Sequence, residues 1–232
     1  MTANREIERI REVYAYYDTS IREQRKREPR NIGNILLARE RERHFATLLK
    51  GLSFFPTSCR VLDVGCGRGD ALAWFHAQGV PARNLYGVDL LPDRIEAARQ
   101  LLPGARLQCA NAEELDLPSE TFNVVACLTV FSSITDQTMA KRIAQSMLRV
   151  LRPNGAVLWY DIRYSNPSNP HTRPMRGQDV RQLFPGFKIH LETISVVPPL
   201  IRRLGFFAET LYPLLAAIPP LRTHLIGFMV KP

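Results

Sequence analysis

The 232-residue sequence predicts an α/β protein with one open, seven-stranded sheet, flanked by helices and preceded by a helical cap. Three observations support this fold. Short apolar runs alternate with helical patterns after residue 51, which is typical of strands joined by crossover helices. A glycine-rich turn follows the first apolar run, and the late segment FKIHLETISVV alternates like a strand beyond the last crossover. We therefore expect parallel strands with one antiparallel strand near the C-terminus.

The first fifty residues predict a helical appendage. From Asn4 to Tyr17, apolar residues recur every three or four positions against a charged face, which indicates an amphipathic helix. An Arg- and Lys-dense stretch broken by Pro29 and Gly33 follows, and a second helical pattern runs over 35–50.

The remaining residues, 51–232, predict a single domain in which strands and helices alternate. Each predicted helix is long enough to connect parallel neighbours by a right-handed crossover. The predicted strands cover residues 60–64, 84–89, 105–110, 122–128, 155–162, 187–194 and 224–231, and the predicted helices cover 69–78, 92–102, 137–151 and 177–183.

An apolar segment at about 198–220 has helical spacing but is interrupted by prolines. Three roles fit it: core packing, a lid over an apolar acceptor, or a helix lying in a membrane interface beside Arg202 and Arg203. It is too short and too interrupted to span a bilayer, and the polar N-terminus does not resemble a secretory signal. The four cysteines lack C-x-x-C spacing, so we expect a cytoplasmic protein with free thiols and no metal site.

The stretch VLDVGCGRGD indicates a ligand site at the end of the first strand. Gly65, Gly67 and Gly69 let the backbone approach a ligand, and the following helix presents free N–H groups to the same point. A nicotinamide or flavin enzyme would have G-x-G-x-x-G, whereas the spacing here is G-x-G-x-G. Asp63, two residues before the first glycine, suits a ligand that carries an amino group.

Polar residues also follow the next two predicted strands. Asp89 ends the second strand, where a carboxylate can accept hydrogen bonds from both hydroxyls of a ribose. Asn111, Ala112 and Glu113 follow the third strand and suit the polar edge of an adenine. Together these positions predict a ligand made of an amino acid joined to a nucleoside.

Four stretches, VLDVGCGRGD, LYGVDLLPDRIEAAR, CANAEELDLPSETFNVVACLTVF and MLRVLRPNGAVLWYDIR, resemble the successive motifs of class I S-adenosylmethionine-dependent methyltransferases. More narrowly, they resemble the small-molecule branch of ubiquinone-biosynthesis type, similar to methyltransferase type 11. The resemblance covers about Arg60 to Arg163 and implies a Rossmann-like methyltransferase sheet with S-adenosylmethionine as cofactor and S-adenosylhomocysteine as product.

The resemblance also implies the cofactor contacts. The methionine end would lie against Asp63 and the glycine turn, the ribose against Asp89, the adenine against Leu90 and residues 111–113, and the sulfonium beside Leu128 and Thr129. Asn111 departs from the family's usual Asp, so we expect weaker cofactor binding. The cofactor residues implied are Asp63, Gly65, Cys66, Gly67, Gly69, Asp89, Leu90, Asn111, Ala112, Glu113, Leu128 and Thr129, with Tyr17 closing over the cofactor or only packing in its helix.

The acceptor should meet loops at the carboxyl ends of the strands, above all a substrate loop at about 163–176. Asp161 and His171 are the candidates for a general base; otherwise Asp161 caps or forms an ion pair and His171 is solvated. Phe131 would flank the acceptor or belong to the core. The candidate substrate residues are Phe131, Tyr160, Arg163, Asn166 and Arg173.

We expect a metal-independent methyltransferase that acts on oxygen or nitrogen, rather than carbon, of a small molecule in secondary-metabolite, sugar or lipid-like biosynthesis. The net charge of +9 and the Arg-rich stretch 22–43 leave an RNA methyltransferase as an alternative, but the sequence after the fourth strand, LTVF, lacks the motif of exocyclic-amine modifiers, and acids dilute the basic stretch. A non-catalytic scaffold that binds the cofactor is the second alternative. The oligomeric state is left open.

Overall fold

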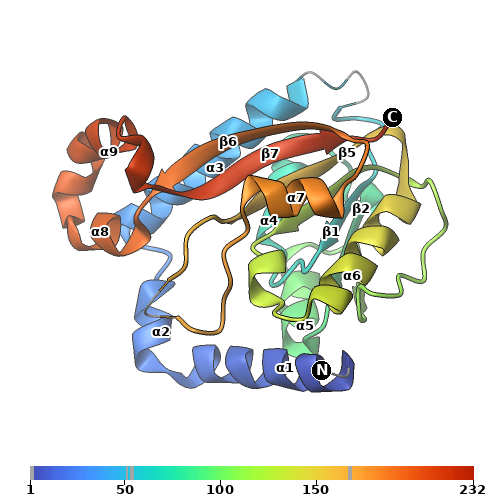
Figure 1. The fold of residues 1–232 in the computed structure, drawn as a ribbon, viewed down its shortest axis with the longest axis horizontal. Helices are drawn as coiled ribbons and strands as arrows, with labels where there is room; N and C mark the ends of the chain where they lie inside the picture. Colours follow the sequence, from blue (N-terminus) through green and yellow to red (C-terminus); the bar gives the residue numbers. More distant parts are fainter. Residues whose placement is uncertain (1–2, 51, 53–54, 167–168) are drawn as a thin grey trace.

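The computed structural model describes residues 3–50, 52, 55–166 and 169–232. Seven strands form one sheet in the order β3-β2-β1-β4-β5-β7-β6 (Figure 1). Their bounds are β1 Val61–Val64, β2 Leu85–Asp89, β3 Arg106–Cys109, β4 Phe122–Leu128, β5 Leu151–Ile162, β6 Lys188–Val196 and β7 Arg222–Val230.

The pairing of these strands confirms the predicted sheet. β1 pairs with β2 and β4 in parallel, and β3 and β5 extend the parallel part on either side. β7 is antiparallel to both β5 and β6, which makes it the one reversed strand. β5 begins earlier than the predicted residue 155, because Leu151 already pairs with Phe122 before the register shifts. Asn154, with a φ of 59°, lies in this irregular stretch, and such local distortions are hard to predict from a sequence.

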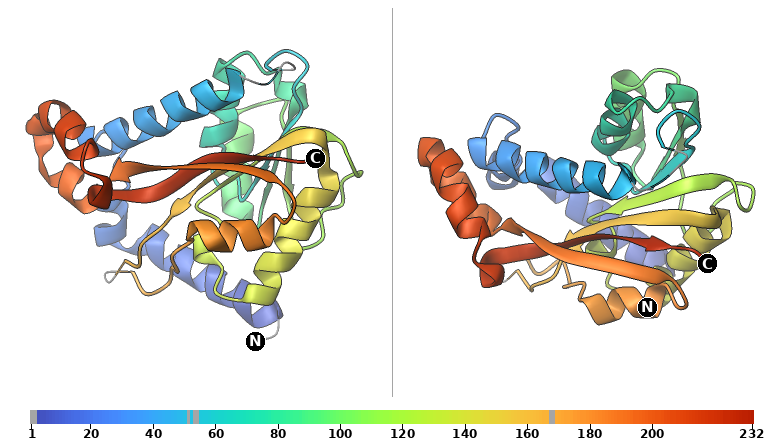
Figure 2. Two further views of the ribbon diagram at one scale, coloured as in Figure 1. Left: turned by 45° about the horizontal axis from the view of Figure 1, so that its top comes forward. Right: turned by 90° about the horizontal axis from the view of Figure 1, so that it is seen from above.

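Helices cover both faces of the sheet (Figure 2). One apolar cluster joins β-strand residues to Met139, Ile143 and Met147 of α6 (Gln137–Val150) and to Val180 of α7 (Gly177–Leu183). A second cluster on the other face contains side chains from α3 (Ile32–Lys50), α4 (Asp70–Ala77) and α5 (Pro92–Leu101). The parallel strands are therefore buried on both sides, as expected for an α/β sheet.

The N-terminal segment forms α1 (Ala3–Thr19), α2 (Ile21–Lys26) and α3. α1 runs across the end of the sheet, and α2 links it to α3 (Figure 1). α2 was not predicted, because its six residues are nearly all polar and give no apolar period. Phe45 and Leu49 of α3 pack in the second cluster, so this part of the expected appendage lies on the sheet itself. Gly51, at the expected boundary, lies outside the described residues.

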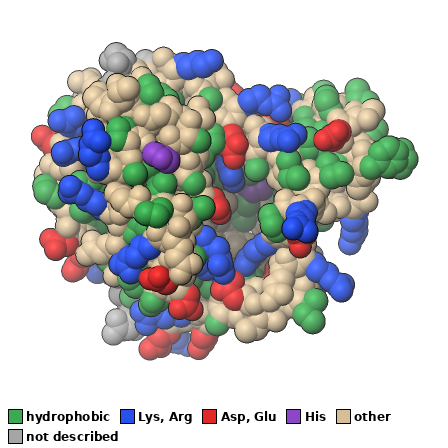
Figure 3. All heavy atoms as spheres, turned by 180° about the vertical axis from the view of Figure 1, so that it is seen from behind, with side chains coloured by type: hydrophobic (Ala, Val, Ile, Leu, Met, Phe, Trp, Pro, Cys, Tyr) green, Lys and Arg blue, Asp and Glu red, His purple; other side chains and the backbone are tan. Residues whose placement is uncertain are grey.

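The segment between β6 and β7 contains α8 (Pro198–Arg203) and α9 (Ala208–Ala216). Ile201, Ala208 and Tyr212 pack with Leu37 and Val196 in a third, small cluster. Seen from behind, this segment forms a lobe at the right edge, and a hollow bordered by Lys and Arg side chains separates it from the body (Figure 3).

Candidate functional site

The carboxyl ends of the parallel strands surround a cavity of about 230 Å³. β1 reaches it through Gly65, whose φ of +71° is unfavourable for any residue with a Cβ. A Cβ at this position would also lie 2.7 Å from Val130 Cγ2. The glycine turn is thus required by two independent constraints, backbone conformation and close packing against the loop after β4.

Asp89 fixes the glycine turn to the end of β2. Its Oδ2 accepts a hydrogen bond from the Gly67 N–H at 2.8 Å, and its Oδ1 accepts one from the Leu91 N–H at 2.9 Å. Burial raises the pKa of Asp89, although these backbone hydrogen bonds oppose that shift. Each carboxylate oxygen can accept a further hydrogen bond, so Asp89 keeps acceptor capacity toward the cavity.

Asp63 lies beside Asp89 on the neighbouring strand, in parallel register with Gly87. Burial, reinforced by the nearby Asp89, raises the pKa of Asp63 to about 8, while Arg41 of α3 opposes the shift. Among the described residues, no group donates a hydrogen bond to its buried Oδ1. A buried carboxyl oxygen without a partner is costly, so this atom is suited to a ligand that brings a donor or a positive charge.

Asn111 follows β3 and is held by Glu113. The Asn111 Nδ2 donates to Glu113 Oε1 at 3.0 Å, and its Oδ1 accepts from the Glu113 N–H at 3.0 Å. Glu113 in turn forms an ion pair with Arg142 of α6 at 2.8 Å. Glu113 therefore points toward α6 and positions the Asn111 amide.

Most of the expected cofactor residues meet at this cavity. Those that line it are Gly65, Gly67, Asp89, Leu90, Asn111, Ala112, Leu128 and Thr129. Asp63, Cys66, Gly69 and Glu113 are not among the lining residues: Glu113 holds the Asn111 amide, and Asp63 is buried on β1 with its Oδ1 unpartnered among the described residues. The lining also contains residues that were not predicted, chiefly Ile10 and Tyr14 of α1, Arg94 of α5 and Met139 and Ile143 of α6.

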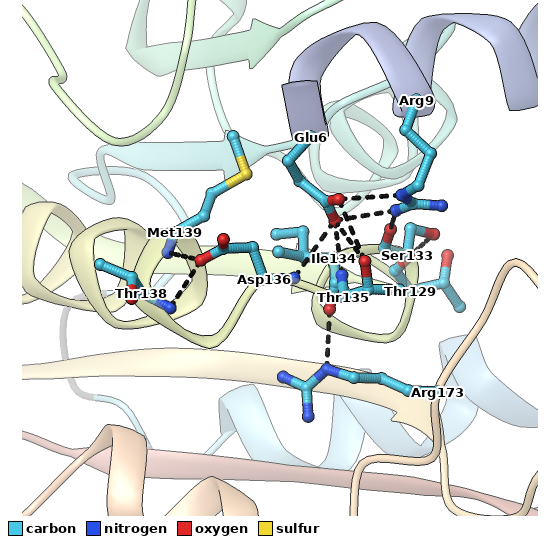
Figure 4. A network of polar contacts seen from close by, with 10 residues as sticks. All are labelled: Glu6, Arg9, Thr129, Ser133, Ile134, Thr135, Asp136, Thr138, Met139 and Arg173. Carbon is cyan, nitrogen blue, oxygen red and sulfur yellow. Dashed lines mark hydrogen bonds and ion pairs between the residues drawn. The ribbon is translucent and has the colours of Figure 1, made fainter. Parts of the chain in front are cut away.

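Helix α1 covers the cavity and is anchored at both ends. Near its start, Glu6 accepts hydrogen bonds from the Thr135 N–H at 2.6 Å and from the Thr135 hydroxyl, while Arg9 donates to the Ser133 carbonyl at 2.6 Å (Figure 4). Near its end, Asp18 pairs with Arg94 at 2.5 Å. Burial disfavours the charged form of Glu6, but hydrogen bonds from Arg9 and Thr135 outweigh it and lower its pKa to about 2.

Comparison with known proteins identifies the fold that carries this site. Residues 61–155 match the family described as "Methyltransferase domain". The chain therefore carries a methyltransferase domain. The matched residues are similar to methyltransferases of the S-adenosylmethionine-dependent type, which indicates S-adenosylmethionine as the methyl donor.

Individual relatives agree with this domain. The chain is 34% identical over 126 residues to phthiotriol/phenolphthiotriol dimycocerosates methyltransferase 1 of Mycobacterium ulcerans, covering 53% of this chain and 45% of the relative. It is 33% identical over 116 residues to the ubiquinone/menaquinone biosynthesis C-methyltransferase UbiE of Hahella chejuensis, covering 47% and 45%. The match thus spans less than half the length of these curated relatives.

A solved structure supports the fold alone. An S-adenosylmethionine-dependent methyltransferase from Mesorhizobium loti superposes with a TM-score of 0.61 at 18% identity, covering 81% of this chain and 97% of that one. Together with the strand order, this confirms the Rossmann-like methyltransferase sheet predicted from the sequence.

The methyltransferase cavity fits its cofactor chemically. The unpartnered Asp63 oxygen suits the ligand's ammonium group, and Asp89 has acceptor capacity for ribose hydroxyls. A Cβ at Gly67 would meet nothing within 4 Å, so the turn is open there. Ala112, Met139 and Ile143 give the apolar surface that an adenine needs.

Tyr17 does not line the cofactor cavity. Its hydroxyl donates to Asn169 Oδ1 at 3.0 Å and its ring lies under Arg27, so the side chain faces the substrate loop. Tyr14, on the adjacent turn of α1, lines the cavity instead. His171 lies with Tyr17 in a second, smaller pocket outside the cofactor cavity.

Asp161 is engaged by backbone N–H groups. It is buried, accepts hydrogen bonds from the Ser132 N–H at 3.0 Å and from the Ile162 N–H at 2.8 Å, and has a pKa raised by burial to about 6. It holds the loop after β4, the capping role that the sequence left as its alternative. Arg173 fixes the same loop by donating to the Ile134 carbonyl at 2.7 Å (Figure 4).

The other expected substrate residues lie at different depths. Phe131 is fully buried against Trp159 in the core, with ring centroids 5.1 Å apart, and so does not flank an acceptor. Tyr160 is buried, stacks on His224 at 4.7 Å and hydrogen-bonds to Ser195. Arg163 lies over the Tyr164 ring, and the Asn166 carbonyl accepts from the Asn169 N–H. Pro167 and Ser168 of the substrate loop lie outside the described residues.

Proposed function

We propose that this chain transfers the methyl group of S-adenosylmethionine to a small-molecule acceptor. The observation that carries the proposal is the placement of Asp63, Asp89 and Asn111 at the ends of three adjacent strands, around one glycine turn. These groups match an ammonium, a ribose and an adenine in the order in which the cofactor presents them. The donor supplies an activated methyl group, so the protein's task is to align the acceptor and exclude water.

Different residues of this chain bind the cofactor, exclude water and position the reacting carbon. Asp89 and the glycine turn fix the ribose and methionine ends, and Asn111 presents an amide to the adenine edge. Ile10 and Tyr14 of α1 cover the cavity and exclude water. Thr129, with a φ of 56°, turns the chain out of β4 and stays exposed beside Leu128, where we place the reacting carbon.

We infer that the acceptor lies next to Thr129, along β5 and β7. The Thr129 N–H donates to the Tyr160 carbonyl at 2.7 Å, and Arg41 lies over the Tyr160 ring at 5.4 Å. Burial lowers the pKa of His224 to about 3, helped by Arg41 and Arg202, so this histidine is neutral at pH 7. The positive charges of Arg41 and Arg202 favour an acceptor that carries a phosphate, a carboxylate or another anionic group.

Methyl transfer can be tested with methyl-labelled S-adenosylmethionine and water-soluble and lipid extracts of the source organism. We expect the methyl label to appear in one small-molecule fraction, together with an equal molar amount of S-adenosylhomocysteine. The variant Asp89→Ala should form neither product. Retention of the labelled product on an anion exchanger would support the positive acceptor site. Cofactor binding without transfer to any fraction would instead indicate a scaffold, and label in RNA a nucleic-acid methyltransferase.

We further expect oxygen or nitrogen as the acceptor atom. One relative is named a C-methyltransferase, so the position of the methyl group in the purified product is the test. A new carbon–carbon bond in that product would contradict this part of the proposal.

A further inference from the structure

The lobe formed by α8 and α9 exposes an unusual number of apolar side chains. Five of the nine exposed large hydrophobic residues in the described part of the chain lie on it. Phe206 is 72% exposed, Leu214 65% and Phe207 58%. We call the five residues the apolar tip: Leu200, Phe206, Phe207, Leu214 and Ile218.

The apolar tip is presented by a well-anchored scaffold. The opposite side of the lobe packs on α3 through Ile201, Ala208 and Tyr212. The Tyr212 hydroxyl donates to Glu40 at 2.6 Å, and Arg202 donates to Asn34 at 2.7 Å. No residue of the tip lines the cofactor cavity. The lobe is therefore fixed with the apolar tip facing outward and away from the cofactor cavity.

Basic residues accompany the tip. Between residues 198 and 222 the sequence contains three arginines, Arg202, Arg203 and Arg222, and only one acid, Glu209. Arg203 is exposed, and the lobe projects beyond the end of the sheet (Figures 1 and 3). Aromatic and aliphatic side chains next to arginines form the pattern by which interfacial segments bind anionic membranes.

We propose that the apolar tip inserts into the interface of an anionic lipid membrane and holds the protein at its surface. Taking about 200 Å² for each fully exposed side chain, the tip offers roughly 550 Å². This is the size of the largest, often functional apolar patch on a monomer, about 300–600 Å², and is below the about 800 Å² per partner of a stable dimer. A two-fold contact between copies would also place the Arg203 side chains of both copies in one interface, with Glu209 as the only acid of this segment, whereas anionic headgroups neutralise them.

Co-sedimentation with extruded vesicles tests the proposal without requiring methyl transfer. The full chain is mixed with vesicles of phosphatidylglycerol and phosphatidylcholine, or of phosphatidylcholine alone. We expect binding to the anionic vesicles that weakens in high salt, and a loss of about tenfold or more in the partition coefficient for Phe206→Ser/Phe207→Ser.

The matched control is Ile21→Ser/Leu101→Ser, which removes two side chains of similar exposure, 68% and 50%, from other parts of the surface. This control should bind vesicles like the unmodified protein, and both variants should keep their circular dichroism spectrum and their affinity for S-adenosylhomocysteine. Vesicle binding unaffected by Phe206→Ser/Phe207→Ser, or absent in the unmodified protein, would overturn the proposal. A dimer in light scattering that this variant dissociates would also overturn it, in favour of a second copy.

Discussion

At the level of single residues, Asp63 links cofactor binding to protons. With a pKa of about 8, its carboxyl is mostly protonated at pH 7, and a bound ammonium group favours the carboxylate. We expect binding of S-adenosylhomocysteine at pH 7 to release about half to one proton. Calorimetry in buffers of different ionisation enthalpy measures this number. Asp63→Asn should release far fewer protons when it binds S-adenosylhomocysteine. Equal proton release by both proteins would contradict the role given to Asp63.

The same group shapes the pH dependence of stability. The folded protein holds the Asp63 proton up to about pH 8, whereas the ordinary pKa of this carboxyl group, which applies in the unfolded chain, is 3.8. The folded state therefore binds more protons in this window, and the contribution of Asp63 to the free energy of unfolding is fully present below pH 3.8 and is lost as the pH rises through 8. Denaturant titrations at several pH values should show a flatter profile for Asp63→Asn. An identical slope in both proteins would be inconsistent with the buried carboxyl.

The pairing of Asn111 with Glu113 explains the departure from the family's usual Asp. A carboxylate at position 111 would face the Glu113 carboxylate at about the 3.0 Å that now separates amide and acid. Because of Glu113, and contrary to the expectation from the sequence alone, Asn111→Asp should lower the stability by about 1–2 kcal/mol and weaken S-adenosylhomocysteine binding at pH 7. Asn111→Asp/Glu113→Gln should recover both. Melting curves and calorimetry test this, and tighter binding by Asn111→Asp alone would refute the explanation.

The polar residues of the site were more predictable from the sequence than the apolar ones. Gly65, Asp89 and Asn111 stand at strand ends, and the carboxyl ends of parallel strands meet at one edge. The contributions of Ile10 and Tyr14 could not be predicted, because an amphipathic helix shows which side is apolar but not what it covers. For the same reason, Tyr17 was predicted to close over the cofactor, whereas Tyr14 lines the cavity.

At the level of elements, helix α1 covers the cavity, and Glu6 anchors this helix to the loop that contains Thr135. Glu6→Gln keeps the shape of the side chain but removes the charge that Arg9 and Thr135 stabilise. We expect about three- to tenfold weaker binding of S-adenosylhomocysteine and faster amide exchange in α1, because closing the cover loses about 1 kcal/mol. Glu12→Gln, on the exposed side of α1, is the control. Unchanged affinity and exchange in Glu6→Gln would show that α1 is held by other contacts.

The contacts by which Glu6 holds α1 should contribute the same stability at all pH values near neutrality. The pKa of Glu6 is lowered from 4.5 to about 2, so its stabilising contribution is complete above about pH 4.5 and is lost as the pH falls through 2. Amide exchange in α1, corrected for the intrinsic pH dependence, should thus be constant from pH 5 to 8. A marked change in this range would assign the anchoring to another group.

The regular elements were predictable because their patterns are long or repeated, and the exceptions were short or irregular. α2 lacks an apolar side, and the early start of β5 depends on a register shift that no pattern records. The segment between β6 and β7 had helical spacing, but Leu200, Phe207 and Leu214 are exposed in the structure. Spacing alone does not distinguish a helix face turned to the core from one turned to solvent or lipid.

At the scale of the whole molecule, the cofactor cavity and the lobe of α8 and α9 lie at the same, carboxyl edge of the sheet. The cavity lies under α1, and the lobe follows the carboxyl end of β6, at the other side of the strand order from β3 (Figure 1). Among the described residues, no helix is long and apolar enough to cross a bilayer. A protein held at a membrane by the apolar tip would meet acceptors dissolved in or attached to that membrane, while its cofactor enters from water.

The central claim is that the cavity binds the nucleoside cofactor through Asp89. Titration calorimetry with S-adenosylhomocysteine on the unmodified chain, on Asp89→Ala and on the control Asp93→Ala, an exposed acid four residues away, tests it most directly. We expect a dissociation constant of about 1–100 µM for the unmodified chain and the control, and at least about tenfold weaker binding for Asp89→Ala. No binding by the unmodified chain, or equal binding by all three proteins, would contradict the account.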